Sequence, residues 1–316
     1  KTLTVSTLAR AMQGSFKRIQ FTPDLVPADL VGTRIYNQKS GEFSTVLGPV
    51  FANLVLADEI NRAPAKVQSA LLEVMQERQV TIAGETHPVP KPFLVMATQN
   101  PIENEGVYPL PEAQRDRFLF KVLVDYPSVE EEREIVYRMG NTPPTASQVL
   151  DPETMLTLQR KAANVFVHHA LIDYVVRVIT ATRRPAEAGL DEVAGWLSYG
   201  ASPRATLGIV GAARALALIR GRDYVIPQDV VEVMPDVLRH RLVLSYDALA
   251  DEIDADQIIT RVLQTVGLPQ VSAQQAPMPP APQAPPQQPA RAPQMPPQQP
   301  PAPGQPQQQP PQPQAR

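Results

Sequence analysis

An uninterrupted apolar run, residues 54–57 (LVLA), ends in two adjacent acids, Asp58 and Glu59, and narrows the possible folds more than any other stretch of the chain. A short continuous apolar run is typical of a strand buried on both faces of a parallel sheet. The carboxyl ends of such strands border the crevice where open α/β sheets bind ligands. One carboxylate there can hold Mg²⁺ while its neighbour orients a nucleophilic water, as phosphate-chain hydrolysis requires. The alternative is an acidic strand end that caps a helix.

Strand and helix patterns alternate over residues 1–126. Further strands are expected at 19–21, 93–97 and 118–124, a hairpin at 79–89, and helices at 1–12 and 64–77. This alternation predicts an α/β domain with a parallel sheet. The apolar spacing then becomes helical, with helices expected at 129–138, 152–164, 170–183, 190–197, 204–220, 227–238 and 254–266. Residues 127–271 are therefore predicted to form an all-helical domain.

The end of the chain, residues 272–316, differs from the rest in composition. It holds 17 Pro and 14 Gln, two of the chain's 29 basic residues and none of its 32 acidic residues. A segment with almost no large apolar side chain cannot form a core, so we expect a disordered Pro/Gln-rich tail. The alternative is a docking motif for an aromatic groove, because P-x-x-P spacings such as Pro277 to Pro280 occur.

Composition excludes several classes of protein. Without the tail the net charge is about −5, so a nucleic-acid partner is not expected. The absence of Cys excludes disulfides, thiolate metal sites and Cys nucleophiles, and it fits a cytoplasmic protein. The longest apolar stretch, residues 207–219, contains Arg214 and is too short to span a membrane. The four His show no metal-ligand spacing, and no nucleophile elbow or dinucleotide fingerprint occurs.

Two further polar signals stand where a phosphate site would need them. Lys1 and Thr2 precede a helix directly, as do the last residues of a phosphate-binding loop. Asn100 follows the strand expected at 93–97, where its amide can bond both an attacking water and a phosphate oxygen. The alternative for Asn100 is a turn-forming residue before Pro101.

Three Arg complete the set of candidates. Arg115 and Arg117 flank Asp116 before the strand expected at 118–124, and one of them can reach a phosphate across a subunit boundary. Arg204 lies at the start of a helix, after Ser202 in the N-cap position. A surface position is the alternative for each Arg, with Asp116 as the partner of Arg115 or Arg117.

Taken in order, these signals resemble the AAA+ family of ATPases, and more closely its MoxR branch. The matching sequence motifs are spread over residues 1 to about 268. They consist of residues 18–25 (RIQFTPDL), 32–33 (GT), 41–43 (GEF), 48–51 (GPVF), 57–63 (ADEINRA), 68–77, 98–101 (TQNP), 105–106 (EG), 108–114 (YPLPEAQ) and 202–204 (SPR). The resemblance implies a P-loop NTPase core followed by a helical lid domain.

The resemblance also implies roles for the residues that hold ATP and Mg²⁺. Lys1 resembles the Walker A lysine that contacts the β- and γ-phosphates, and Thr2 resembles the hydroxyl that binds Mg²⁺. Asp58 matches the metal-holding acid of the Walker B motif, and Glu59 matches the catalytic glutamate that activates water. Asn100 matches the sensor-1 residue.

The remaining implied roles belong to Arg side chains. Arg117 matches the arginine finger that enters the neighbouring subunit's site, and Arg115 is the second candidate for that role. Arg204 matches sensor 2 on the helical lid. Residues 32–51 resemble the family's insertion within the second core helix.

The family works as ring oligomers, usually hexamers, that act as chaperone-like machines. Its usual partners are proteins with a von Willebrand factor A domain, and its typical task is maturation or metallocofactor insertion. The glycine-rich part of the phosphate loop does not occur before Lys1. We therefore expect the sequence to be an N-terminally truncated part of an active ATPase. The fragment by itself is expected to be inactive. A nucleic-acid remodelling AAA+ ATPase and a non-hydrolysing scaffold are the alternative functions.

Overall fold

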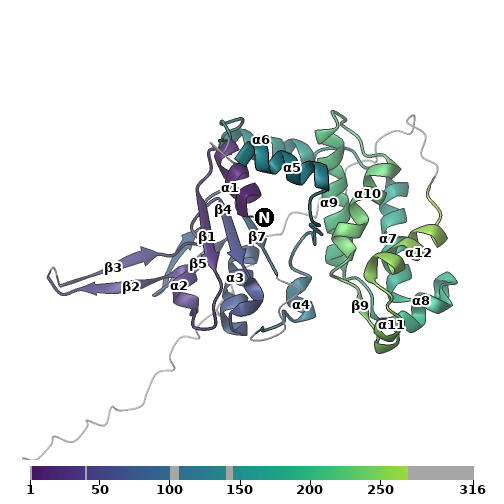
Figure 1. The fold of residues 1–316 in the computed structure, drawn as a ribbon, viewed down its shortest axis with the longest axis horizontal. Helices are drawn as coiled ribbons and strands as arrows, with labels where there is room; N and C mark the ends of the chain where they lie inside the picture. Colours follow the sequence, from purple (N-terminus) through teal and green to yellow (C-terminus); the bar gives the residue numbers. More distant parts are fainter. Residues whose placement is uncertain (1, 40, 100–106, 140–144, 270–316) are drawn as a thin grey trace, which may run out of the picture. The chain divides into compact units, whose positions relative to one another are not determined.

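Three parallel strands form the sheet of the first domain: β1 (Phe16–Gln20), β4 (Leu54–Asp58) and β7 (Leu94–Ala97), in the order β1-β4-β7. The computed structural model describes residues 2–39, 41–99, 107–139 and 145–269 (Figure 1). The strands predicted at 54–57 and 93–97 are confirmed, and the one predicted at 19–21 begins earlier and ends at Gln20. In the register, Gln20 lies beside Asp58, so β1 and β4 end together.

The central strand, β4, is buried on both faces, as its uninterrupted apolar run predicts. Its first and third residues pack with α1 (Thr2–Ala11), and its second and fourth belong to the cluster that contains α3 (Ala65–Glu77). Successive side chains of a strand point to opposite faces, so one apolar run serves both layers. The helices predicted at 1–12 and 64–77 are thereby confirmed.

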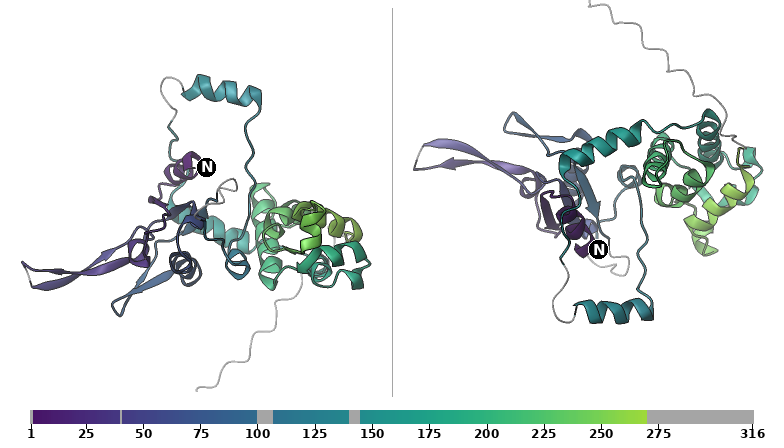
Figure 2. Two further views of the ribbon diagram at one scale, coloured as in Figure 1. Left: turned by 60° about the horizontal axis from the view of Figure 1, so that its bottom comes forward. Right: turned by 90° about the horizontal axis from the view of Figure 1, so that it is seen from above.

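Two antiparallel hairpins extend this domain. The predicted hairpin at 79–89 is confirmed as β5 (Gln79–Ile82) and β6 (Glu85–Pro88). A second hairpin, β2 (Gly32–Asn37) and β3 (Glu42–Leu47), follows α2 (Pro27–Val31) directly and projects away from the sheet (Figures 1 and 2). It occupies the stretch that we assigned to a family insertion, where the apolar pattern predicted no strands.

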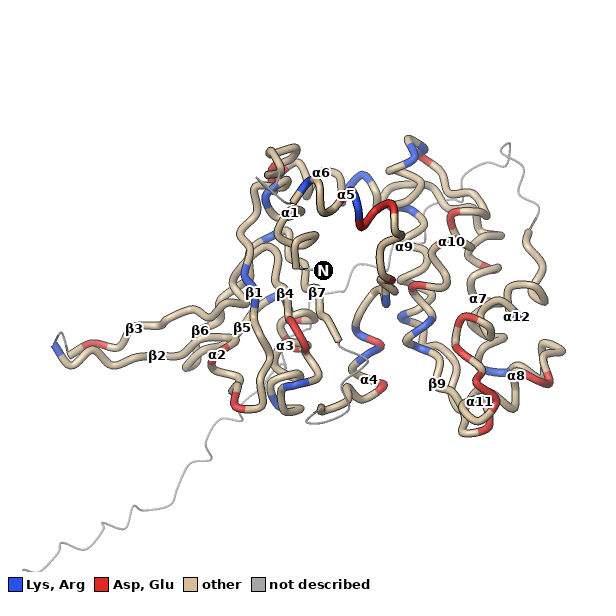
Figure 3. The backbone as a smooth tube through the Cα atoms, viewed as in Figure 1, with Lys and Arg blue, Asp and Glu red and all other residues tan. Residues whose placement is uncertain are grey.

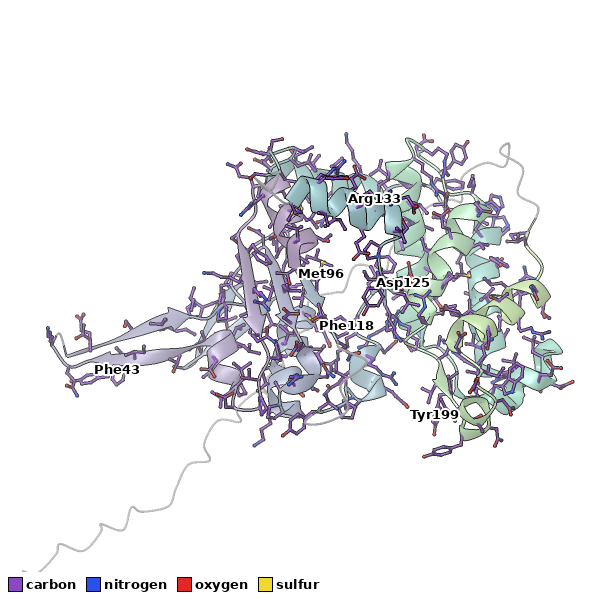
Figure 4. All side chains as sticks on the ribbon, viewed as in Figure 1. Phe43, Met96, Phe118, Asp125, Arg133 and Tyr199 are labelled. Atoms are coloured by element: carbon purple, nitrogen blue, oxygen red, sulfur yellow. The ribbon has the colours of Figure 1, made fainter. Side chains whose placement is uncertain are left out.

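The strand predicted at residues 118–124 is wrong, because the chain there belongs to no sheet. Its backbone groups bond the helical domain instead: the Lys121 amide donates to the Asp236 carbonyl at 2.8 Å. A strand forms only against the edge of another strand. Among the described residues, no strand pairs with the edge of β7 that faces away from β4. Met96 of β7 is labelled in Figure 4. The run bonds the helical domain and does not pair with this open edge of β7.

The rest of the described chain is mainly helical and confirms the predicted helices to within a few residues. The helices are α4 (Glu112–Arg115), α5 (Val129–Met139), α6 (Pro152–Ala163), α7 (His169–Arg183), α8 (Asp191–Trp196), α9 (Pro203–Ile219), α10 (Pro227–Leu238), α11 (Tyr246–Ala250) and α12 (Ala255–Thr265). Two short strands of this part of the chain, β8 (Leu197–Tyr199) and β9 (Val243–Leu244), pair with each other in antiparallel fashion. Apolar side chains from α7, α9, α10 and α12 share one buried cluster.

Two further predictions concern the ends of this architecture. The tail at 272–316 lies outside the described residues, and the domain boundary near residue 126 stays a prediction. Throughout the described ranges, no helix combines the length and the apolar character that crossing a bilayer requires.

Candidate functional site

Thr98, the residue after β7, holds the carboxyl end of β4. Its amide donates to the Ala57 carbonyl at 2.9 Å, and its carbonyl accepts from the Ile60 amide at 3.0 Å. Its hydroxyl accepts from the Glu59 amide at 2.9 Å and donates to the Asp58 carboxylate at 2.5 Å. One residue thus uses its amide, carbonyl and hydroxyl to fix both acids at the end of β4, the strand labelled in Figure 3.

The Asp58 carboxylate also pairs with Arg18 on the neighbouring strand β1. The Arg18 Nε and Nη2 atoms lie 2.9 and 2.6 Å from Asp58 Oδ2. The Asp58 side chain is 15% exposed, whereas that of Arg18 is 49% exposed. An ion pair with a half-exposed partner contributes only about 0–1 kcal/mol. A divalent cation can therefore replace Arg18 beside this carboxylate at little cost.

The chemistry of the available donors fits Mg²⁺. The carboxylate of Asp58 and the hydroxyl of Thr2 are hard oxygen ligands of the kind that this ion prefers. Within the described residues, no group of three or more His, Cys, Asp or Glu gathers into a metal site. Mg²⁺ in phosphate-transfer sites takes one or two carboxylates and completes its shell with waters and phosphate oxygens. One carboxylate and one hydroxyl suit that mode of binding.

The packing of α1 places Thr2 toward the Asp58 end of the sheet. After α1 the chain turns at residues 12–13, and the amide and hydroxyl of Ser15 each donate to Asn53 Oδ1 at 3.0 Å, beside the start of β4. Helix α1 therefore runs opposite to β4 as it packs on the sheet. Its 10 residues span about 15 Å, and the 5 residues of β4 span about 16 Å. The first residue of α1, Thr2, is therefore level with the last residue of β4, Asp58.

Glu59 has a strained backbone. Its φ of 56° and ψ of 51° lie in the left-handed region, which costs a non-glycine residue about 1–2 kcal/mol. The bond to Thr98 and the start of the short helix η1 (Ile60–Arg62) hold it there. Its carboxylate pairs with Arg62 at 3.0 Å, and both side chains are 34% exposed. Strained positions cluster at functional sites, which supports a functional role for Glu59.

Asp116, directly after α4, accepts hydrogen bonds from three side chains of the helical domain. Ser202 Oγ lies 2.8 and 2.9 Å from its two carboxylate oxygens. Arg204 Nη1 lies at 3.2 Å, and Arg241 Nε at 2.9 Å. Burial alone would raise the pKa of Asp116, but these three donors outweigh it and leave that pKa below its ordinary value. The carboxylate is therefore ionised and fully engaged.

The two finger candidates differ in their surroundings. Arg117 is exposed, and its side chain forms no hydrogen bond or ion pair within the described residues. Arg115 is half-buried, and its Nε is a buried atom that has no hydrogen-bond partner among the described residues. The carboxylate of Asp116 pairs with Arg204 and Arg241, so the surface pair that was the alternative for Arg115 or Arg117 is not formed. Arg117 is thus available to another molecule.

The predicted site residues form two groups in the structure. Asp58 and Glu59 are joined through Thr98, whereas Arg204 is joined to Asp116. Lys1 and Asn100 lie outside the described residues.

Three residues of these groups were missed in the sequence. Thr98 follows a predicted strand, so the rule that selected Asn100 applies equally to it. Arg18 directly follows Lys17 in β1, and Arg241 ends a basic triplet. Nothing in the sequence around Arg18 or Arg241 predicts that its partner is Asp58 or Asp116, respectively.

The sequence matches two protein-family models and several known proteins. Residues 1–120 match the sequence model of the ATPase family associated with various cellular activities (AAA), and residues 193–262 match that of the AAA lid domain. Chaperone MoxR1 of Mycobacterium tuberculosis is 72% identical over 273 residues, which are 86% of this chain and 72% of that protein. Protein MoxR of Methylorubrum extorquens is 31% identical over 291 residues, with 85% and 83% covered.

A solved structure has the same fold. The crystal structure of a protein of Cytophaga hutchinsonii, described as an ATPase, superposes with a TM-score of 0.81 at 48% sequence identity. The match covers 85% of this chain and 82% of that chain. It therefore spans both the parallel-sheet domain and the helical domain.

Proposed function

The chain belongs to the MoxR family of AAA+ ATPases, and on that premise we propose that it hydrolyses ATP in order to remodel or mature other proteins. One observation carries the proposal: a buried parallel strand delivers Asp58 and Glu59 to its carboxyl end, where Thr98 bonds both. Ligands of open α/β sheets bind at that end. Two adjacent acids there can divide metal binding and water activation between them.

Each residue has a proposed task in this reaction. Lys1 contacts the β- and γ-phosphates, while the hydroxyl of Thr2 and the carboxylate of Asp58 hold Mg²⁺. The bound ion neutralises negative charge on the phosphates. Glu59 accepts a proton from the attacking water, and Asn100 orients that water. The strained backbone of Glu59 supports this assignment, because the structure around it over-determines its position.

The proposal includes an oligomeric ring, with a hexamer as its expected form. Arg117 of one subunit stabilises the transferring phosphoryl group in the next, and Arg204 senses the nucleotide bound by its own subunit. The support is that Arg117 is exposed and lacks a side-chain partner in the described part of the chain. An exposed arginine with no partner among the described residues of its own subunit suits a role in a neighbouring site.

The proposed clients are proteins, acted on in the cytoplasm. A relative at 72% identity is named a chaperone, which supports protein remodelling as the task. A protein with a von Willebrand factor A domain is our proposed client or adaptor, and metallocofactor insertion is one form that the maturation would take.

The decisive experiment compares ATP turnover and ATP binding in the full-length protein and its Glu59→Gln variant. We expect Mg²⁺-dependent hydrolysis in the parent and none in the variant, while both bind ATP, because Glu59 acts on water and other groups hold the phosphates. Glu73→Gln, at an exposed position of α3, is the matched control and should hydrolyse normally. ATP binding without turnover in the parent would instead favour a non-hydrolysing scaffold.

A further inference from the structure

The guanidinium of Arg241 binds the backbone on both sides of Arg117. Arg241 Nη2 lies 3.1 Å from the Asp116 carbonyl and 2.6 Å from the Phe118 carbonyl. Arg241 Nη1 lies 3.0 Å from the Leu119 carbonyl. Arg117 is therefore the one residue of this four-residue segment whose carbonyl Arg241 does not bind, and it lies between two that it does.

We call these contacts of Arg241 with the carbonyls of Asp116, Phe118 and Leu119 the Arg241 clamp. Further hydrogen bonds of Arg241 and His240 strengthen it. Arg241 Nε donates to the Asp116 carboxylate at 2.9 Å, and Nη1 also donates to the Val237 carbonyl one turn earlier in the chain. His240 Nε2 lies 2.9 Å from the carbonyl of Phe118, which is labelled in Figure 4. The Arg241 side chain is only 3% exposed, so water does not compete for its donors.

The clamp holds the backbone and leaves the Arg117 side chain available. A planar guanidinium offers five donors in a fixed fork, so contacts to three carbonyls and a carboxylate define one backbone geometry. Arg117 itself is exposed and makes no side-chain hydrogen bond within the described residues. A fixed base and an unpaired charged end suit a group that must reach a phosphate in another subunit, because positioning lowers the entropic cost of reaction.

We propose that Arg241 is a positioning residue for Arg117, an inference that rests on the proposed role of Arg117 in the neighbouring site. Asp116 extends the link, because its carboxylate binds both Arg241 and Arg204. Asp116 thereby connects Arg204, the proposed sensor of the nucleotide in its own subunit, with Arg117, the proposed finger in the next site.

The test is subunit mixing with Arg241→Gln. Alone, this variant should bind ATP but turn it over at least tenfold more slowly than the parent. Mixed with Glu59→Gln subunits, part of the activity should return. In the mixed ring a subunit with normal Glu59 and altered Arg241 can receive a well-held Arg117 from its Glu59→Gln neighbour. A merely structural defect would damage the variant's own site, and mixing would not repair it.

The controls separate this inference from its premise. Arg222→Gln breaks an Arg–Asp pair with a fully buried carboxylate in the same domain, at 2.6 Å, without touching the Arg117 segment, and it should keep parental turnover. Arg117→Ala mixed with Glu59→Gln must regain activity; if it does not, the proposed trans role fails and the inference with it. Rescue of Arg117→Ala but not of Arg241→Gln, or parental turnover in Arg241→Gln, overturns the positioning role alone.

A second variant covers the case in which Arg241→Gln does not fold. Arg241→Lys keeps a charge beside Asp116 but cannot bridge three carbonyls, because an ammonium has no planar fork. It should fold, turn over ATP at least fivefold more slowly than the parent, and regain activity on mixing. Parental turnover in folded Arg241→Lys, or a loss that mixing does not restore, would exclude the clamp as the reason for the effect.

Discussion

The hydroxyl of Thr98 donates to the carboxylate of Asp58 while it accepts from the amide of the next residue, Glu59. A single hydroxyl thus sets the orientation of the proposed metal-binding acid and the strained backbone of the proposed catalytic acid. Because both bonds are made by one oxygen, the positions of Asp58 and Glu59 are coupled. The neighbouring strand, rather than β4 alone, determines how the two acids are presented.

Thr98→Val is expected to lower both turnover and stability, because valine keeps the shape and loses the hydroxyl. The Glu59 amide and one Asp58 oxygen would lose their partner, which destabilises the fold by about 1–3 kcal/mol. We expect turnover to fall at least tenfold. Urea unfolding and steady-state hydrolysis measure the two effects. Thr81→Val, at an exposed hydroxyl on β5, is the control and should change neither; equal behaviour of the two variants would contradict the role of Thr98.

Arg117→Ala should bind ATP and hydrolyse it about 10³–10⁵ times more slowly than the parent, the range found for arginine fingers. Arg115→Ala is the comparison that decides between the two candidates. Arg115 is half-buried, so we expect at most a modest loss of turnover from it, accompanied by a loss of stability. Single-turnover rates at saturating ATP measure the difference. A larger rate loss in Arg115→Ala would transfer the finger role to that residue.

The buried His240 predicts an acid-sensitive fold. Burial lowers the pKa of His240 to about 4, and Arg241 and Lys121 add to this effect, while the Phe118 carbonyl and Asp116 oppose it. In the unfolded chain the ordinary pKa is about 6.5, so the unfolded state binds the proton first as pH falls. The free energy of unfolding therefore decreases below about pH 6.5, by about 2 kcal/mol between pH 7 and pH 5 from this residue.

His240→Gln should remove this part of the pH dependence, because the glutamine amide can still donate to the Phe118 carbonyl but does not titrate. Urea unfolding at pH 7 and pH 5 measures it, with His169→Gln at an exposed position as the control. An unchanged difference between the two pH values in His240→Gln would show that another group causes the acid sensitivity.

Removal of residues 272–316 should leave ATP hydrolysis within twofold of the parent rate. The segment contains no acid to place at a phosphate site and almost no large apolar side chain to support the fold. Steady-state turnover of the truncated and intact proteins at equal subunit concentration is the measurement. A tenfold loss would show that the tail takes part in assembly or catalysis.

Most of the helices could be predicted from the sequence, because their signals are local. The spacing of apolar side chains and the Ser202 N-cap placed α9 within one residue of its observed start. Prediction failed where a strand depends on a distant partner. Residues 118–124 have the composition of a strand but bond the helical domain and not the open edge of β7. The β2–β3 hairpin forms although its sequence lacks an alternating apolar pattern.

The position of Asp58 and Glu59 together at the end of a buried strand can be predicted from the sequence, because adjacency and an apolar run are properties of neighbouring residues. The groups that bind these two acids, and the group that binds the Arg117 segment, become visible only in the folded protein. Thr98 is 40 residues from Asp58, and Arg241 is 125 residues from Asp116. Contacts at such separations depend on strand order and helix packing, in which the whole chain competes for partners, so no local pattern specifies them.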